Sequence, residues 1–279
     1  MLRCRLDPPD SMSARFAAAL DWLTTKPHLV RMPRVLVFAG TVLAALGVVT
    51  GTAAQTPSAA QRAPYDLTGT WVSVVTEDWR WRMLTPPRGD YASVPMTPAA
   101  RAMADQWDPA ADVLAGNECR PYGAGGIMRI PGRLRISWAD ENTLRLEADA
   151  GQQTRLFHFG EFEAEPAPTW QGNSKAEWEM VGARRGSPPT GGNLKVQTTG
   201  MKSGYLRWNG VPYSEQAVIT EFFDRYAAFG QEWFTVTTVI EDPIYLSEPF
   251  ILSTDFRKEA DDSGWNPTPC LTDPPVVDN

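Results

Sequence analysis

Apolar and polar residues alternate with a period of two over most of this chain, and this pattern constrains the fold more than any other feature. It recurs in the segments 134–138, 144–148, 154–159, 176–180, 194–199, 217–224, 233–240 and 250–257. Turns that contain Gly or Asn separate most of these segments. Such alternation is typical of β-strands with one buried face, because successive side chains point to opposite sides of a sheet. The sequence therefore predicts an all-β protein.

A further alternating segment, from residue 71 to 83, separates aromatic from charged side chains. Trp79 and Trp81 occupy one side of this expected strand, and Arg80 and Arg82 occupy the other. The two sets must face opposite ways in a strand, so only one of them can point into the protein. An aromatic interior would suit an apolar ligand, whereas an arginine interior would suit a carboxylate or a phosphate-like group.

Eight or nine strands at short spacing, without helices between them, predict an antiparallel sheet closed into a barrel. A barrel of this size has room for one small ligand. One short helix is expected after Thr97, which has the character of an N-cap and is followed by Pro98. The helix is predicted over 99–107, because Asp108-Pro109 follows it.

The first expected strand begins with Gly69-Thr70-Trp71, which resembles the Gly-x-Trp signature that opens lipocalin-like barrels. The resemblance implies that Trp71 plugs the closed end of the barrel. Residues 65–270 also resemble a group of uncharacterised exported bacterial proteins. The resemblance is seen in the short motifs at 77–83, 127–129 and 241–246. It implies a domain with these bounds and no particular reaction.

Residues 32–54 have the layout of an export signal: a basic start, an apolar run of 15 residues and small residues at the end. The apolar run is shorter than the roughly 20 residues that a membrane-spanning helix needs. We expect cleavage after Ala54, with an uncleaved membrane anchor as the alternative. Met32 is then the working start, residues 1–31 are an upstream extension, and the mature protein is expected in the periplasm or secreted.

Removal of residues 1–54 changes the charge of the protein. These residues hold six of the 26 basic and three of the 33 acidic side chains, which leaves a net charge of about −10. Nucleic acids and anionic membranes are poor partners for such a chain, because binding them requires positive charge. We expect a small-molecule partner, with membrane contact only through an uncleaved signal segment.

Two cysteines, Cys119 and Cys270, remain after the expected cleavage. Two thiols in an oxidising compartment predict one disulfide, which would hold the C-terminal part of the chain against the body. Residues 55–64 are rich in Ser, Ala, Pro and Gln and are predicted to be a linker. A single β-barrel domain is expected over 65–270, followed by a disordered tail at 271–279.

The chain contains 11 Trp residues, and the set as a whole favours an aromatic pocket. Trp138 and Trp178 belong to the expected lining, with core packing as the alternative for each. Arg133 follows the Gly-rich loop 123–126 and is a candidate for a basic rim at the pocket mouth. The loop lacks the Gly-Lys-Ser/Thr ending of a phosphate-binding loop, which excludes a nucleotide site there.

His158 is the only histidine beyond the expected cleavage point. One histidine cannot form a His-based metal centre, and no loop has the spacing of a calcium site, so neither a metal nor a cofactor is expected. His158, with Glu221 or Asp78 as an acidic partner, would suit isomerase, dehydratase or hydrolase chemistry near neutral pH. The alternatives are a hydrogen-bonded structural histidine, a Glu221 paired with an arginine, and an Asp78 paired with Arg80 that leaves Arg82 free.

Three hypotheses of function remain. The favoured one is an exported binding protein that holds a small, partly apolar ligand in an aromatic-lined barrel. The second is a cofactor-free enzyme that uses His158 with an acidic partner in the same cavity. The third is a structural or assembly protein of the cell envelope, which would present a large exposed apolar patch.

Overall fold

The computed structural model describes residues 56–182, 185 and 191–272. The predicted export signal at 32–54, the upstream extension at 1–31 and residues 273–279 of the predicted tail lie outside the described residues. Within them, no helix is long and apolar enough to cross a membrane.

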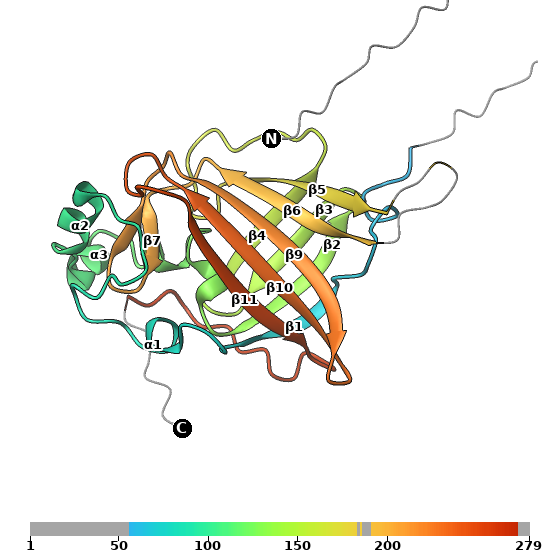
Figure 1. The fold of residues 1–279 in the computed structure, drawn as a ribbon, viewed down its shortest axis with the longest axis horizontal. Coiled ribbons are helices and arrows are strands. Elements are labelled where there is room, and N and C mark those ends of the chain that lie inside the picture. Colours follow the sequence, from blue (N-terminus) through green and yellow to red (C-terminus); the bar gives the residue numbers. More distant parts are fainter. Residues whose placement is uncertain (1–55, 183–184, 186–190, 273–279) are drawn as a thin grey trace, which may run out of the picture. The chain divides into compact units, whose positions relative to one another are not determined.

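Nine strands form a closed barrel, and all eight of the alternating segments beyond residue 130 lie in it (Figure 1). This confirms the predicted all-β barrel. Around the barrel the strands follow the order β1-β11-β10-β9-β6-β5-β4-β3-β2. Their bounds are β1 Gly69–Val74, β2 Arg133–Asp140, β3 Thr143–Ala148, β4 Gln153–Phe159, β5 Asn173–Val181, β6 Gly191–Thr199, β9 Val218–Ala228, β10 Gln231–Glu241 and β11 Phe250–Lys258.

One strand pair corrects the prediction of a purely antiparallel barrel. β4 and β5 are parallel, with Phe157 opposite Ser174. Residues 160–172 carry the chain back along the barrel before β5 begins. A closed ring with an odd number of strands cannot alternate in direction throughout, so at least one neighbouring pair must run the same way.

The prediction of one strand over 71–83 is wrong. β1 ends at Val74, and the short helix α1, Trp79–Arg82, follows. Asp78, directly before the helix, has a left-handed backbone with φ of 51°, which is incompatible with a continuing strand. The alternation of Trp and Arg in this segment therefore does not describe two faces of a strand.

The helix predicted after Thr97 is confirmed as α2, Pro98–Ala104, although it ends three residues before Trp107. The Thr97 hydroxyl accepts a hydrogen bond of 3.2 Å from the Ala100 N–H, as expected of an N-cap. Other short elements accompany it: helix α3, Pro109–Leu114, and two 3₁₀ turns at Arg120–Tyr122 and Ile127–Arg129.

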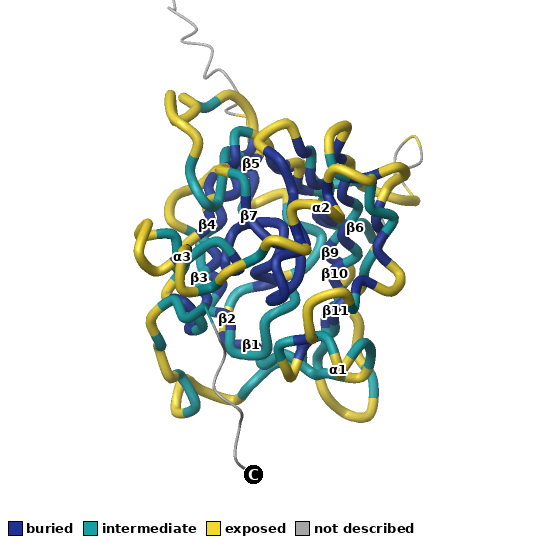
Figure 2. Tube along the Cα trace, turned by 90° about the vertical axis from the view of Figure 1, so that its left-hand side faces the viewer, coloured by how far each residue is buried: buried dark blue, intermediate teal, exposed yellow. Residues whose placement is uncertain are grey.

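A small hairpin, β7 Gly204–Arg207 and β8 Val211–Tyr213, lies at one end of the barrel with α2 and α3 (Figure 1). Figure 2 looks onto this end and shows the buried residues of β7 at its centre. Tyr213 is fully buried there in an apolar cluster. A side chain at Gly125 would come within 2.8 Å of the Tyr213 ring, so the Gly-rich loop serves close packing.

Side chains that point inward fill the middle of the barrel. Trp71 is fully buried, donates a 2.8 Å hydrogen bond to Leu67 O and packs edge-on against Phe234. The buried aromatic cluster also contains Phe157, Phe223 and Phe256. This arrangement is consistent with a lipocalin-like barrel.

The disulfide Cys119–Cys270 is present, as predicted, with the two Cα atoms 5.1 Å apart. It holds the last described residues against the body of the protein. Thr268 N–H donates to Asp149 O at 2.9 Å, and Leu271 N–H donates to the Tyr122 hydroxyl at 3.1 Å. The C-terminal segment is therefore anchored to the body of the protein at Thr268, Cys270 and Leu271.

Candidate functional site

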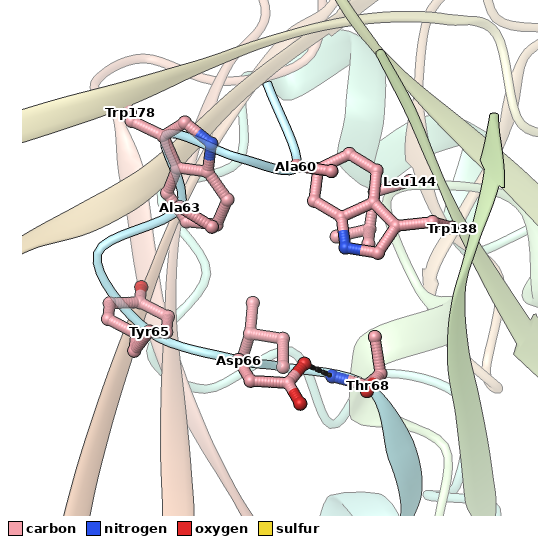
Figure 3. A pocket seen from close by; sticks show the side chains of 9 residues that line it. Ala60, Ala63, Tyr65, Asp66, Thr68, Trp138, Leu144 and Trp178 are labelled. Carbon is pink, nitrogen blue, oxygen red and sulfur yellow. Dashed lines mark hydrogen bonds between the residues drawn. The ribbon is translucent and has the colours of Figure 1, made fainter. Parts of the chain in front are cut away.

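A pocket with a volume of about 460 Å³ lies at one mouth of the barrel, where residues 58–68 cross it (Figure 3). We call it the mouth pocket. Strands β2, β3 and β5 supply part of the wall, and the N-terminal segment supplies the rest. The lining residues are Ala60, Ala63, Tyr65, Asp66, Leu67, Thr68, Trp138, Leu144 and Trp178.

Residues 56–64, the described part of the linker predicted at 55–64, belong to the folded domain, which corrects that prediction for these residues. Ser58 and Ala59 are buried. Ala59 N–H donates to Asn142 Oδ1 at 2.9 Å, and Ala59 O accepts from Trp178 Nε1 at 3.0 Å. Polar groups at the barrel rim thus satisfy the backbone of a segment whose composition alone resembles that of a linker.

Tyr65 fixes the segment further along. Its hydroxyl donates to Phe223 O and accepts from Leu194 N–H at 3.0 Å, so it bridges β9 and β6. Burial raises the pKa of Tyr65, because the phenolate would lose its hydration. Tyr65 is therefore a neutral structural anchor, and its ring forms a wall of the pocket.

The two indole rings of the mouth pocket are held by a row of aromatic contacts. Phe159 packs against Trp138, with centroids 5.6 Å apart, and stacks on Trp178 at 5.4 Å. Trp178 in turn meets the Tyr65 ring edge-on at 5.6 Å. These contacts restrict the orientation of both indoles, so the pocket has rigid aromatic walls before any ligand arrives.

Two polar groups of the pocket remain available to a ligand. Among the described residues, Trp138 Nε1 has no hydrogen-bond acceptor, and it faces the open space of the pocket in Figure 3. One Asp66 carboxylate oxygen accepts from Thr68 N–H at 2.8 Å. Asp66 is exposed, and its other carboxylate oxygen has no hydrogen-bond donor among the described residues. The pocket therefore has one indole donor and one carboxylate acceptor among its lining residues.

The structure separates the residues that were predicted to bind a ligand. Trp138 and Trp178 line the mouth pocket together. Trp79 lies outside it on α1 and is 64% exposed. Trp81 packs against the guanidinium groups of Arg80, at 5.0 Å, and Arg207, at 4.5 Å.

The predicted pairing of Asp78 with Arg80 is wrong. Asp78 pairs with Arg129 at 2.7 Å, whereas Arg80 pairs with Asp90. Arg82 is not a free anion-binding group, because it is buried and forms an ion pair with Glu77. The chain bends at α1, and this brings partners to these arginines that an extended strand could not reach.

Arg133 also has a carboxylate partner. Its Nε donates to Glu259 at 2.7 Å, near the C-terminal end of β11. It lines a separate pocket of about 470 Å³ together with Arg82, Trp208 and part of the disulfide-anchored segment. The structure therefore places Arg133 away from the residues of the mouth pocket.

The three candidate catalytic residues do not come together. His158 lies on the outer face of β4, where its ring stacks on Phe162 at 4.4 Å and its Nδ1 is 3.3 Å from the Thr143 hydroxyl. Burial lowers the pKa of His158, and the nearby Asp140 opposes this shift. Glu221 lies inside the barrel, and Asp78 lies beside α1.

Glu221 forms a fully buried ion pair with Arg155, at 2.9 and 2.6 Å. Arg155 also donates to the Thr198 hydroxyl at 3.2 Å. The Glu221 carboxylate therefore forms a structural ion pair inside the barrel. It lies on the inner face of the barrel wall, whereas His158 lies on the outer face. In the part of the chain that the structure describes, no group of three His, Cys, Asp or Glu residues is arranged to hold a metal.

Sequence reasoning missed Tyr65, Asp66 and Thr68 because they lie at the edge of the presumed linker. Their one local signal is the Asp-Leu-Thr-Gly-Thr-Trp phrase at 66–71, in which Asp66 caps the turn before β1. Comparisons with protein families, with curated proteins and with solved structures give no match for this chain. The assignment of a function therefore depends on the geometry of the site.

Proposed function

We propose that this protein is an exported binding protein that holds a small, flat, partly apolar molecule in the mouth pocket. The observation that carries the proposal is the arrangement of Trp138, Trp178 and Tyr65 around one space of about 460 Å³. Pockets of about 300–1,000 Å³ lined by aromatic side chains and a few polar groups are typical of small-molecule sites.

The polar groups define the chemistry of the ligand. An indole N–H at Trp138 calls for an acceptor on the ligand, and the Asp66 carboxylate calls for a hydroxyl or amine donor. A flat face of the ligand, between its acceptor and its donor, would lie against the indole rings. A hydroxylated aromatic ring, or the apolar face of a sugar, meets all of these requirements.

Export is supported by two independent features. Residues 32–54 have the layout of a signal peptide, and Cys119 and Cys270 form a disulfide. Structural disulfides persist in oxidising compartments and are rare in the cytosol. A binding protein in the periplasm or the medium also needs no cytosolic cofactor, which agrees with the hypothesis of ligand capture.

The test uses protein exported from a bacterial host and the neutral fluorescent probe N-phenyl-1-naphthylamine. We expect saturable fluorescence enhancement and at least tenfold weaker binding in Trp138→Ala, equivalent to about 1.4 kcal/mol. The matched control is Trp79→Ala, which removes an indole that is 64% exposed and outside the pocket. This control should bind the probe like the wild type.

Native mass spectrometry of the same preparations addresses the natural ligand. A molecule that co-purifies with the wild type and with Trp79→Ala, and is lost from Trp138→Ala, would identify it. Equal probe affinity in wild type and Trp138→Ala, with both variants folded by circular dichroism, would refute the proposed site.

A further inference from the structure

A second pocket opens beside β11 because β1 is too short to cover all of that strand. β1 pairs only with the residues from Asp255 to Lys258, whereas β10 pairs with β11 from Phe250 onward. The uncovered start of β11 lines a pocket of about 620 Å³. Phe250 and Leu252 form apolar walls on the strand, and Val94 and Pro95 contribute from the segment before α2.

Arg207, at the end of β7, lines this pocket and is only 8% exposed. Its Nη1 donates to Ala92 O at 2.7 Å, and its guanidinium packs over the Trp81 ring at 4.5 Å. No carboxylate of the described residues lies within ion-pair distance of the Arg207 guanidinium. Among these residues, Ala92 O is the only acceptor to which the guanidinium donates a hydrogen bond. Arg207 is thus a positioned buried cation with unused donors.

The other deeply buried arginines of the described chain contrast with Arg207. Arg155 is paired with Glu221 at 2.6 Å, and Arg82 is paired with Glu77. A buried guanidinium without a counter-ion is costly, because it loses hydration without electrostatic compensation. Burial lowers the pKa of Arg207 to about 10, so the group still carries its charge at neutral pH.

The geometry points to a second binding site, in which Arg207 holds the carboxylate of a small amphiphilic molecule. The planar guanidinium suits a carboxylate, because its parallel N–H groups can bind both oxygens. The apolar chain of the molecule lies along Phe250 and Leu252 on one side and along Val94 on the other. The ligand supplies the direct ion-pair partner that the described residues do not, since Asp78 and Asp90 act on Arg207 only from beyond ion-pair distance.

A monocarboxylate fits this site better than a phosphate ester. Asp78 and Glu248 also line the pocket, and only Asp78 is neutralised by an arginine, Arg129, at 2.7 Å. A doubly charged phosphate would therefore meet carboxylates around a single available guanidinium, and like charges repel strongly at partly buried sites. A single negative charge avoids most of this repulsion.

Calorimetric titration with sodium octanoate tests this site. We expect saturable binding that weakens at least tenfold in Arg207→Gln. The matched control is Arg80→Gln, because Arg80 also packs on Trp81, at 5.0 Å, but pairs with Asp90 and does not line the pocket. Trp138→Ala should keep octanoate binding, which separates this site from the mouth pocket.

Two further measurements decide the chemistry. Octyl phosphate should bind more weakly than octanoate, and tighter binding of the phosphate would overturn the assignment of the ligand class. If Arg207→Gln fails to fold, nuclear Overhauser contacts between octanoate methylenes and the Phe250 ring in the wild type replace the variant as the test. Their absence, or unchanged octanoate affinity in a folded Arg207→Gln protein, would overturn the proposal.

Discussion

The buried ion pair in the barrel gives the sharpest test of how this interior is stabilised. Replacing Glu221 by Gln should lower the free energy of unfolding by about 3 to 5 kcal/mol, the usual range when one partner of a buried pair is removed. The side chains of Arg155 and Glu221 are both 0% exposed. Gln has nearly the same shape as Glu and can still accept a hydrogen bond, so the loss measures mainly the uncompensated charge of Arg155.

The size of this effect follows from the contacts of the pair. Two hydrogen bonds, of 2.9 and 2.6 Å, join Arg155 to Glu221. In Glu221→Gln only neutral acceptors would remain for the guanidinium: the amide oxygen of the new side chain and the Thr198 hydroxyl, at 3.2 Å. One neutral hydrogen bond contributes only about 0.5 to 1.5 kcal/mol, too little to offset a buried charge. Removing both charges in Arg155→Met/Glu221→Leu should therefore restore stability to near the wild-type value or above it.

Urea unfolding followed by Trp fluorescence, with the disulfide intact, measures Glu221→Gln, the double variant and its two component single variants, Arg155→Met and Glu221→Leu. If the unpaired charge of Arg155 dominates the loss, the double variant must be more stable than Glu221→Gln. A loss below about 1 kcal/mol in Glu221→Gln, within the range of an ordinary hydrogen bond, would refute it. So would a double variant whose loss equals the sum of the single losses, because contacting residues of a charge pair should not behave additively.

Three other predictions concern the disulfide, the Gly-rich loop and the histidine. Cys270→Ala should lower the free energy of unfolding by up to about 4 to 5 kcal/mol, because the disulfide closes a long loop. Calorimetry should show this as a lower melting temperature. Gly126→Ala should cost about 1 to 3 kcal/mol in urea unfolding, because its Cβ would lie 2.4 Å from Pro121 O; Gly191→Ala, with 3.5 Å of space, is the control. Burial lowers the pKa of His158, so the unfolded chain binds the proton first and stability should fall as pH drops below about 6.5. The free energy of unfolding of His158→Gln should depend less steeply on pH than that of the wild type. An equally steep dependence in both proteins would contradict this prediction.

Most of the strands could be predicted because their signal is local. Each of the strands from β2 to β6, and from β9 to β11, has one face in the barrel and one face outside, which produces alternation along its own residues. β7 and β8 gave no such signal, because every residue of both is buried. Their run of buried residues is too short to distinguish from a loop.

The candidate site was predictable only in part. Trp138 and Trp178 were expected as lining residues because indole rings suit the wall of a small-molecule pocket, and both line the mouth pocket. Trp79 and Trp81 were grouped with them only because 71–83 was interpreted as a strand. β1 ends at Val74, and the two indoles lie on the helix α1 that follows the left-handed Asp78.

The sequence by itself determined the all-β class, the capped helix after Thr97 and the pairing of Cys119 with Cys270. Each depends on the pattern of neighbouring residues or on the small number of cysteines. Only the tertiary structure decided which charges are paired and where the pockets open. Arg155 and Glu221 are 66 positions apart, and Trp178 meets Ala59 across 119 positions. These contacts form only when segments that are distant in the sequence meet in the closed barrel. The alternation of residues within a single strand therefore cannot predict them.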